Sequence, residues 1–156
     1  MEEQTVGESK GCGSSRCQVC ENVENSSTFS DCKGKIYNVG RGVHDCNSEN
    51  IVYLLTCRTC NIQYVGSCVT KFRTRFNNYK SSYRNFLAGK KAAQTKLHAH
   101  FSQSDHNRDD DWCFTLIESA DTLDKVRRRE AFWQIKLNTF APDGLNERDV
   151  VYDYGD

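Results

Sequence analysis

The amino-acid sequence predicts one α+β domain, and three patterns along the chain favour that fold class. Two short apolar runs, 52–55 and 64–66, flank the stretch 58–61, which is typical of a β-hairpin. Aromatic residues then recur every three or four positions, as on the buried face of a helix. An alternating run at 112–117 predicts a third strand, and a long helical stripe follows it. A chain of 156 residues can hold one such domain with a small appendage.

The expected elements follow one another from residue 51. We expect strands at 51–57, 62–66 and 112–117, and helices at 70–88, 92–102 and 121–138. The first helix is predicted by an aromatic stripe that ends before Gly89: Phe72, Phe76, Tyr79, Tyr83 and Phe86. Asp121 or Thr122 is the expected N-cap of the last helix, because a short side-chain oxygen can accept a bond from a free backbone N–H.

The N-terminal third has a different composition. Residues 1–15 are polar and glycine-rich, which predicts a disordered tail, and residues 16–50 are expected to be a cysteine-rich lead-in held together by zinc. The packed domain is expected at 51–150. The first ten residues carry no apolar leader and no run has membrane-spanning length, so we expect a reducing nuclear or cytoplasmic setting and no membrane.

In a reducing compartment, clustered cysteines favour a metal over disulfides, and the chain has nine cysteines. The pairs Cys17-x-x-Cys20 and Cys57-x-x-Cys60 have zinc-ligand spacing, and together they predict one tetrahedral sulfur site. Other residues are substitutes for these ligands: Cys46, Cys32, Cys12 and His44.

Two further histidines, His100 and His106, have two interpretations. They could bind metal or DNA, but the pattern favours ordinary surface histidines.

Basic residues gather in one part of the chain although the formal net charge is zero. Between residues 50 and 104 there are nine basic residues and no acidic one: Arg58, Lys71, Arg73, Arg75, Lys80, Arg84, Lys90, Lys91 and Lys96. A basic surface attracts phosphates, whereas a solvated helix face is the alternative. The residues expected to contact nucleic acid are Lys71, Arg73, Lys80, Arg84, Lys90 and Lys91.

One carboxylate, Glu130, interrupts the apolar stripe of the last predicted helix between Val126 and Trp133. A charged group there is costly unless it is paired, so Glu130 either bonds an arginine at the edge of the stripe or binds a metal such as Mg²⁺. Arg75 and Tyr79 lie one helical turn apart and share a face, where an arginine could clamp a phosphate. Simple packing of Tyr79 and solvation of Arg75 are the alternatives.

Taken in order, these motifs resemble the GIY-YIG nuclease family over residues 51–146. The matching positions are Tyr53 in the first motif, Tyr64-Val65-Gly66 in the second, Arg75 and Tyr79 in the first helix, the segment 129–133, and Gly144-Leu145-Asn146. Val52, preceded by Asn50 and Ile51, departs from the glycine and isoleucine of the first motif. The resemblance is strongest to nuclease domains of Penelope-like retroelement polyproteins, which also have a cysteine-rich lead-in.

The resemblance implies a small central antiparallel sheet of three strands flanked by helices, and a single-strand cut in DNA that serves retroelement integration. It implies Mg²⁺ or Mn²⁺ on Glu130, whereas the cysteine pairs indicate zinc as a separate structural metal. The implied catalytic roles are a water-activating base (Tyr53, helped by Tyr64), phosphate neutralisation (Arg75), orientation (Tyr79) and loop fixing (Asn146). DNA is the implied partner. A reverse transcriptase domain in the same polyprotein is a second expected partner. No pattern in the sequence specifies an oligomeric state.

Two other classes of function remain. The first is a non-catalytic zinc module that binds nucleic acid through the basic residues, in which Glu130 would be dispensable. The second is an interaction domain on a decayed nuclease scaffold, with a closed cleft or a displaced Tyr53. The complete set of tyrosines, arginine, glutamate and asparagine argues against decay.

Overall fold

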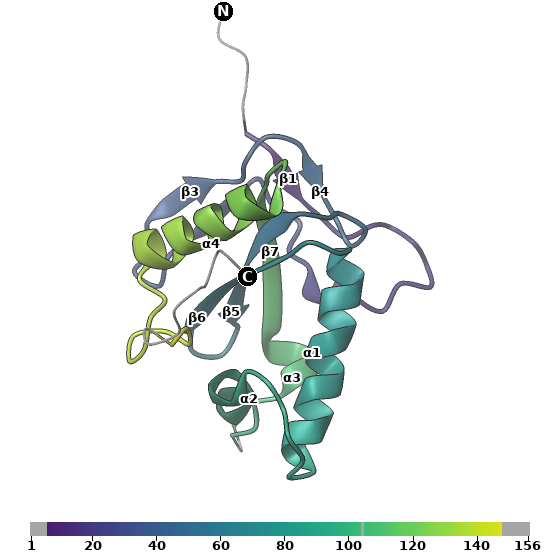
Figure 1. Ribbon diagram of the computed structural model, residues 1–156, viewed down its shortest axis with the longest axis vertical. Helices are drawn as coiled ribbons and strands as arrows, with labels where there is room; N and C mark the ends of the chain where they lie inside the picture. The colour runs from purple at the N-terminus through teal and green to yellow at the C-terminus, as the bar shows by residue number, and fades with distance from the viewer. Residues whose placement is uncertain (1–5, 104, 148–156) are drawn as a thin grey trace, which may run out of the picture.

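The structure is a computed structural model that describes residues 6–103 and 105–147. Its centre is a three-stranded antiparallel sheet with strand order β6-β5-β7 (Figure 1). The bounds of these strands are β5 Ile51–Cys57, β6 Gln63–Cys68 and β7 Trp112–Ser119. In the central strand, Tyr53 lies opposite Gly66 on one side and Leu116 on the other. The predicted α+β fold with a three-stranded antiparallel sheet is confirmed.

Helices follow the predicted order but are shorter than expected. Their bounds are α1 Phe72–Leu87, α2 Thr95–Phe101, α3 Arg108–Asp111 and α4 Leu123–Leu137. Thr122 is the N-cap of α4, and its hydroxyl accepts a 3.2 Å bond from the Lys125 N–H. The single-turn helix α3 was not predicted. None of the helices described is long and apolar enough to cross a membrane.

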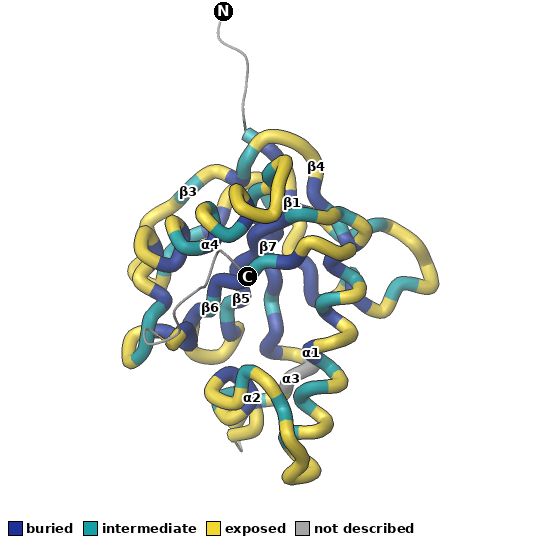
Figure 2. Tube along the Cα trace, in the orientation of Figure 1, coloured by how far each residue is buried: buried dark blue, intermediate teal, exposed yellow. Residues whose placement is uncertain are grey.

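The sheet has a core on each face because alternate residues of a strand point to opposite sides. Tyr53 and Leu55 lie in the core that α1, α2 and β7 share, whereas Val52 and Leu54 lie in the core under α4. Figure 2 shows the three strands mostly buried between helices whose outer surfaces are exposed. The sheet therefore separates the side chains into an α1 face and an α4 face.

The N-terminal segment packs along β7 and protects that edge of the sheet. It contains β1 Glu8–Ser9, η1 Cys20–Asn22, β2 Thr28–Ser30, β3 Ile36–Asn38 and β4 Val43–His44. β1 pairs parallel to β4, and β2 pairs antiparallel to β3. The Leu116 N–H donates to the buried hydroxyl of Ser9 at 3.0 Å, and Glu24 N–H donates to the Phe114 carbonyl at 2.7 Å.

These contacts correct the expected disordered tail at 1–15. Residues 1–5 lie outside the described residues, but residues 8–9 form β1. The order comes from pairing with β4 and β7, distant parts of the chain that a short polar window cannot reveal. The last three residues of the expected domain at 51–150 also lie outside the described residues.

Candidate active site and metal clusters

Three tyrosine hydroxyls meet on the α1 face of the sheet. The hydroxyl oxygens of Tyr53 and Tyr79 lie 2.6 Å apart, and Tyr79 also hydrogen-bonds Tyr64. Tyr53 is 1% exposed and Tyr79 is 2% exposed, whereas Tyr64 is half-buried. Tyr64 is therefore the member of the group that lies nearest to solvent.

Burial keeps the two inner tyrosines neutral. It raises the pKa of Tyr53 and of Tyr79 well above the usual value of 10.0, because the phenolate loses its hydration. The positive charge of Arg75 lowers both pKa values in part. A neutral, enclosed Tyr53 is poorly suited to take a proton from water directly, which does not support the base role expected for it.

Gly66 makes room for the ring of Tyr53. A Cβ atom at Gly66 would lie 2.6 Å from the Tyr53 hydroxyl oxygen and 2.7 Å from Cζ, closer than packed atoms approach. Because the two residues are paired across β5 and β6, the Tyr53 ring lies over the backbone of β6. The glycine of the second motif thus determines where the Tyr53 hydroxyl lies.

Arg75 lies on α1, one turn before Tyr79, and is half-buried. Its Nε is buried and has no hydrogen-bond partner among the described residues. Partial burial works to lower the pKa of Arg75, but the nearby oxygens of Tyr53 and Tyr79 outweigh it and raise the pKa. The guanidinium is therefore a fixed cation with a free donor, which is the chemistry that a phosphate oxygen would satisfy.

Glu130 approaches the edge strand β6 from the α4 face. It is 6% exposed, and its Oε1 accepts a 2.6 Å bond from the Ser67 hydroxyl while Oε2 accepts a 3.4 Å bond from the Gln134 amide. The adjacent Arg129 forms its ion pair with Glu118 instead, at 2.7 Å. Two neutral donors thus contact the carboxylate, and its hard oxygens suit Mg²⁺ or Mn²⁺.

Asn146 fixes the middle of β6. Its Oδ1 accepts bonds from the Val65 N–H at 2.8 Å and the Thr139 hydroxyl at 2.6 Å, and its Nδ2 donates to the Val65 carbonyl at 3.0 Å. The side chain thus pairs with both backbone groups of Val65, as a neighbouring strand would, between Tyr64 and Gly66. Asn146 is thus a positioning residue in this structure.

All six predicted catalytic residues gather around β6 from both of its faces. Tyr64 belongs to the strand, Tyr53 lies over Gly66, and Tyr79 and Arg75 join from α1. Glu130 and Asn146 contact its neighbouring residues Ser67 and Val65. The spacing of the motifs in the sequence did not indicate that these residues would gather around one edge strand.

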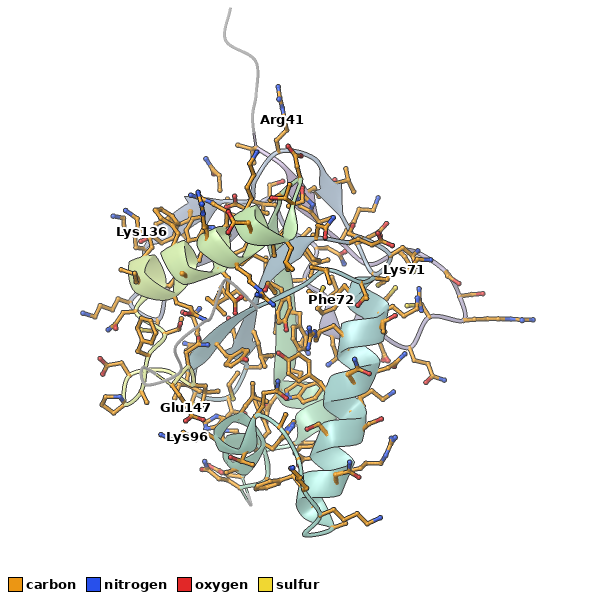
Figure 3. The ribbon with its side chains drawn as sticks, viewed as in Figure 1. Arg41, Lys71, Phe72, Lys96, Lys136 and Glu147 are labelled. Carbon is orange, nitrogen blue, oxygen red and sulfur yellow. The ribbon has the colours of Figure 1, made fainter. Side chains whose placement is uncertain are left out.

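The residues at α1 that were predicted to contact DNA lie on different sides of the helix. Each helical residue advances by about 100°, so Lys71 is roughly 40° from Arg75, whereas Lys80 and Arg84 are roughly 140° and 180° away. Lys80 packs over the Phe76 ring, with its nitrogen 5.8 Å from the centroid. Lys71 lies just before the first turn of α1 (Figure 3).

The remaining predicted contacts also differ in what surrounds them. Lys90 and Lys91 are exposed in the connection between α1 and α2. Arg73 instead points at a cysteine, and its Nη2 lies 3.4 Å from the Cys12 Sγ.

The four cysteines expected in one zinc site lie in two separate clusters. Cys17 and Cys20 lie with Cys12 and Cys46, while Cys57 and Cys60 lie with two histidines, His100 and His106. Within each cluster, the ligand atoms are within 4.8 Å of one another. The single four-cysteine site is wrong, because the end of β5 and the turn after it hold Cys57 and Cys60 near α2, while the lead-in holds Cys17 and Cys20 near the start of α1.

Two of the substitute ligands belong to neither cluster. Cys32 is exposed, and the His44 Nε2 bonds the Gly40 carbonyl at 3.0 Å.

The mixed cluster has the features of a zinc site. The Cys60 Sγ lies 3.3 Å from the His100 Nε2 and 3.7 Å from the His106 Nε2. The other ring nitrogens have partners: His106 Nδ1 is 2.8 Å from Asp105 Oδ1, and His100 Nδ1 is 3.4 Å from the Gln103 amide. Such partners orient the Nε2 atoms of both rings for a metal.

The geometry at these two positions therefore favours metal binding over the ordinary surface histidines that the sequence pattern favoured. A sequence signal was present, because the Cys-x₂-Cys and His-x₅-His spacings are both typical of zinc ligands.

A sheet edge surrounded by tyrosines, an arginine and a carboxylate defines the class of small α+β nuclease domains. The family model of the GIY-YIG catalytic domain matches residues 49–146. The chain therefore belongs to the GIY-YIG family, a nuclease superfamily that acts on DNA and whose members commonly use divalent metals. Neither a curated protein nor a solved structure matches the chain.

Proposed function

We propose that this protein is a metal-dependent DNA endonuclease that nicks one strand by hydrolysing a phosphodiester bond. The observation that carries the proposal is the buried Arg75 Nε, which has no partner among the described residues and lies beside the Tyr53 and Tyr79 hydroxyls. A buried donor without a partner costs about 1–3 kcal/mol. A bound phosphate would remove that cost and place the scissile group at the tyrosines.

Tyr64 orients the attacking water. It is the most exposed of the three tyrosines, and its hydroxyl is fixed by Tyr79, which Tyr53 fixes in turn. Water adds to phosphorus, the bond to the leaving sugar oxygen breaks, and Arg75 neutralises the charge that grows on the phosphoryl oxygens. The water releases its proton to solvent past Tyr64, and the leaving oxygen takes up a proton from solvent.

Glu130 would hold Mg²⁺ or Mn²⁺, which when bound supplies Lewis-acid polarisation of the phosphate. Ser67 and Gln134 keep the carboxylate in one position at the edge of β6. Asn146 keeps that strand straight beside it through both backbone groups of Val65.

DNA approaches from the side of α1 that carries Arg75. Lys71 lies on that side, and the exposed Lys90 and Lys91 extend the positive charge beyond the helix. Lys80 and Arg84 lie on the opposite side of α1, so we expect them to contribute less to binding.

Cys57, Cys60, His100 and His106 of the mixed cluster would hold a structural zinc at the hairpin. Cys57 ends β5 and Cys60 lies in the turn that joins β5 to β6, the two strands that carry Tyr53 and Tyr64. His100 and His106 tie that turn to α2 and the segment after it. A zinc ion bound there would therefore help to fix the spacing of the two tyrosines.

We further propose that the nuclease serves integration of a Penelope-like retroelement, next to a reverse transcriptase domain and in a nuclear or cytoplasmic setting. The cysteine-rich lead-in, which contacts β7 through Ser9 and Val23, supports this proposal because the nuclease domains of Penelope-like elements also have such a lead-in. The nine free cysteines also suit a reducing compartment.

A plasmid-nicking assay tests the function. We expect supercoiled plasmid to become open circles with Mg²⁺ and to stay intact with a chelator. Glu130→Gln keeps an oxygen for the Ser67 hydroxyl, and it should abolish nicking while changing DNA affinity by less than about threefold. Glu147→Gln, at an exposed carboxylate, is the matched control and should nick normally. Tight binding without any nicking by the wild-type protein would establish the non-catalytic zinc module instead.

A further inference from the structure

The four-cysteine cluster of Cys12, Cys17, Cys20 and Cys46 has the dimensions of a tetrahedral zinc site. Three of its Sγ–Sγ distances are 3.7 Å: Cys12 to Cys20, Cys17 to Cys46, and Cys20 to Cys46. A Zn–S bond of about 2.3 Å in a regular tetrahedron places the sulfurs about 3.8 Å apart. A disulfide would need about 2.05 Å, so these thiols are arranged for an ion rather than for oxidation.

The cluster is attached to the first turn of α1. The Phe72 N–H donates to the Ser48 carbonyl at 2.9 Å, and the Arg73 N–H donates to the Cys46 carbonyl at 2.8 Å. The first N–H groups of a helix lack partners within it, and Lys71 makes no side-chain cap bond. The loop that carries the ligand Cys46 therefore caps the helix that carries Arg75 and Tyr79.

Charge adds to this attachment. Four thiolates around one Zn²⁺ leave a net negative charge, which favours the positive end of a helix dipole. The Arg73 guanidinium is already directed at this cluster, with Nη2 3.4 Å from the Cys12 Sγ. Arg73 thus helps to attach the cluster to α1, whereas its position in the sequence had predicted a contact with DNA.

We propose that Cys12, Cys17, Cys20 and Cys46 bind a second structural zinc, and that this ion fixes the first turn of α1 and so the position of Arg75. The lead-in has few apolar residues with which to order itself, and a metal supplies that order. The link to Arg75 rests on the proposed nuclease function, whereas the zinc site does not. The protein then carries two zinc ions with different ligand sets, one at each end of the α1 face.

Zinc stoichiometry tests the site without reference to activity. Elemental analysis of the full chain purified without chelators should give two zinc ions per protein, falling to one in Cys12→Ser and to one in His106→Ala. Cys32→Ser, at an exposed cysteine outside both clusters, is the matched control and should keep two. Cobalt substitution of His106→Ala should show the absorption of a four-thiolate site. One zinc in the wild type that is lost in His106→Ala would overturn the proposal.

Hydrogen exchange tests the attachment to α1. Amides of residues 72–76 should exchange at least about tenfold faster in Cys12→Ser than in the wild type. In His106→Ala, the exchange rate of the same amides should equal that of the wild type. Cys12 is half-buried, so this variant avoids the fully buried Cys46 and should fold. Equal protection in the two variants would refute the attachment. Absence of nicking in the wild type would reject the nuclease, yet both measurements would still report on the zinc.

Discussion

The hydroxyl oxygens of Tyr53 and Tyr79 lie 2.6 Å apart, which joins the central strand of the sheet to α1 through one hydrogen bond. Tyr53 belongs to the first motif and Tyr79 to the first helix, so the bond connects two parts of the site that are 26 residues apart. Both side chains are buried, and the bond therefore fixes the site from inside rather than facing the substrate.

Replacement of the Tyr53 hydroxyl should damage catalysis more than folding. Tyr53→Phe removes one buried hydrogen bond, which should lower the free energy of unfolding by about 1–2 kcal/mol. Without the Tyr53 hydroxyl, the hydroxyls of Tyr79 and Tyr64 are no longer held in position, so nicking should slow by roughly 10²-fold. Tyr83→Phe is the matched control, since the Tyr83 hydroxyl donates to the Phe101 carbonyl away from the site. Equal nicking by the two variants would remove Tyr53 from the mechanism.

A lysine at position 75 should keep the charge and lose the function. Arg75→Lys cannot present a planar fork to the phosphate, so nicking should fall by roughly 10²-fold while DNA affinity changes by less than about threefold. Arg84→Lys makes the same change on the opposite side of α1 and should nick like the wild type. Single-turnover nicking and binding titrations measure the two effects. A full rate for Arg75→Lys would show that any cation suffices there.

Alkaline pH should weaken the fold through the buried tyrosines. Their pKa is higher in the folded chain than in the unfolded chain, so their stabilising effect is complete below about pH 10. It is lost as the pH rises from about 10 toward the folded pKa, because the unfolded chain then releases protons that the folded chain retains. Urea unfolding between pH 8 and 11 should show a shallower decline for the double variant Tyr53→Phe/Tyr79→Phe. Parallel curves for both proteins would contradict this assignment.

Removal of zinc should disable the site even when Mg²⁺ is abundant. Chelation should lower the thermal midpoint by at least about 10 °C, because both clusters lose the ion that orders them. Nicking should return after zinc is added back in reducing buffer, and not after Mg²⁺ alone. His100→Ala should show a partial loss that added zinc does not correct. Full activity of zinc-free protein would disprove a structural role for either ion.

The sequence alone determined the three strands of the central sheet, the helices α1, α2 and α4, and their order along the chain. The aromatic stripe predicted α1, the alternating runs predicted the three strands, and Thr122 was one of the two expected caps of α4. These features are local, because helix and strand periods and capping preferences depend on residues a few positions apart. Short motifs in a fixed order also indicated the family, which the match over residues 49–146 confirms.

Only the tertiary structure decided which distant side chains meet. The sequence could not show that Cys17 and Cys20 join Cys46 while Cys57 and Cys60 join His100 and His106, because every pairing of the motifs satisfies the ligand spacing. It could not show that Arg73 faces a cysteine cluster while Arg75, two residues later, faces the tyrosines. These outcomes depend on where the sheet places α1 and the lead-in, and long-range packing, not local pattern, sets that placement.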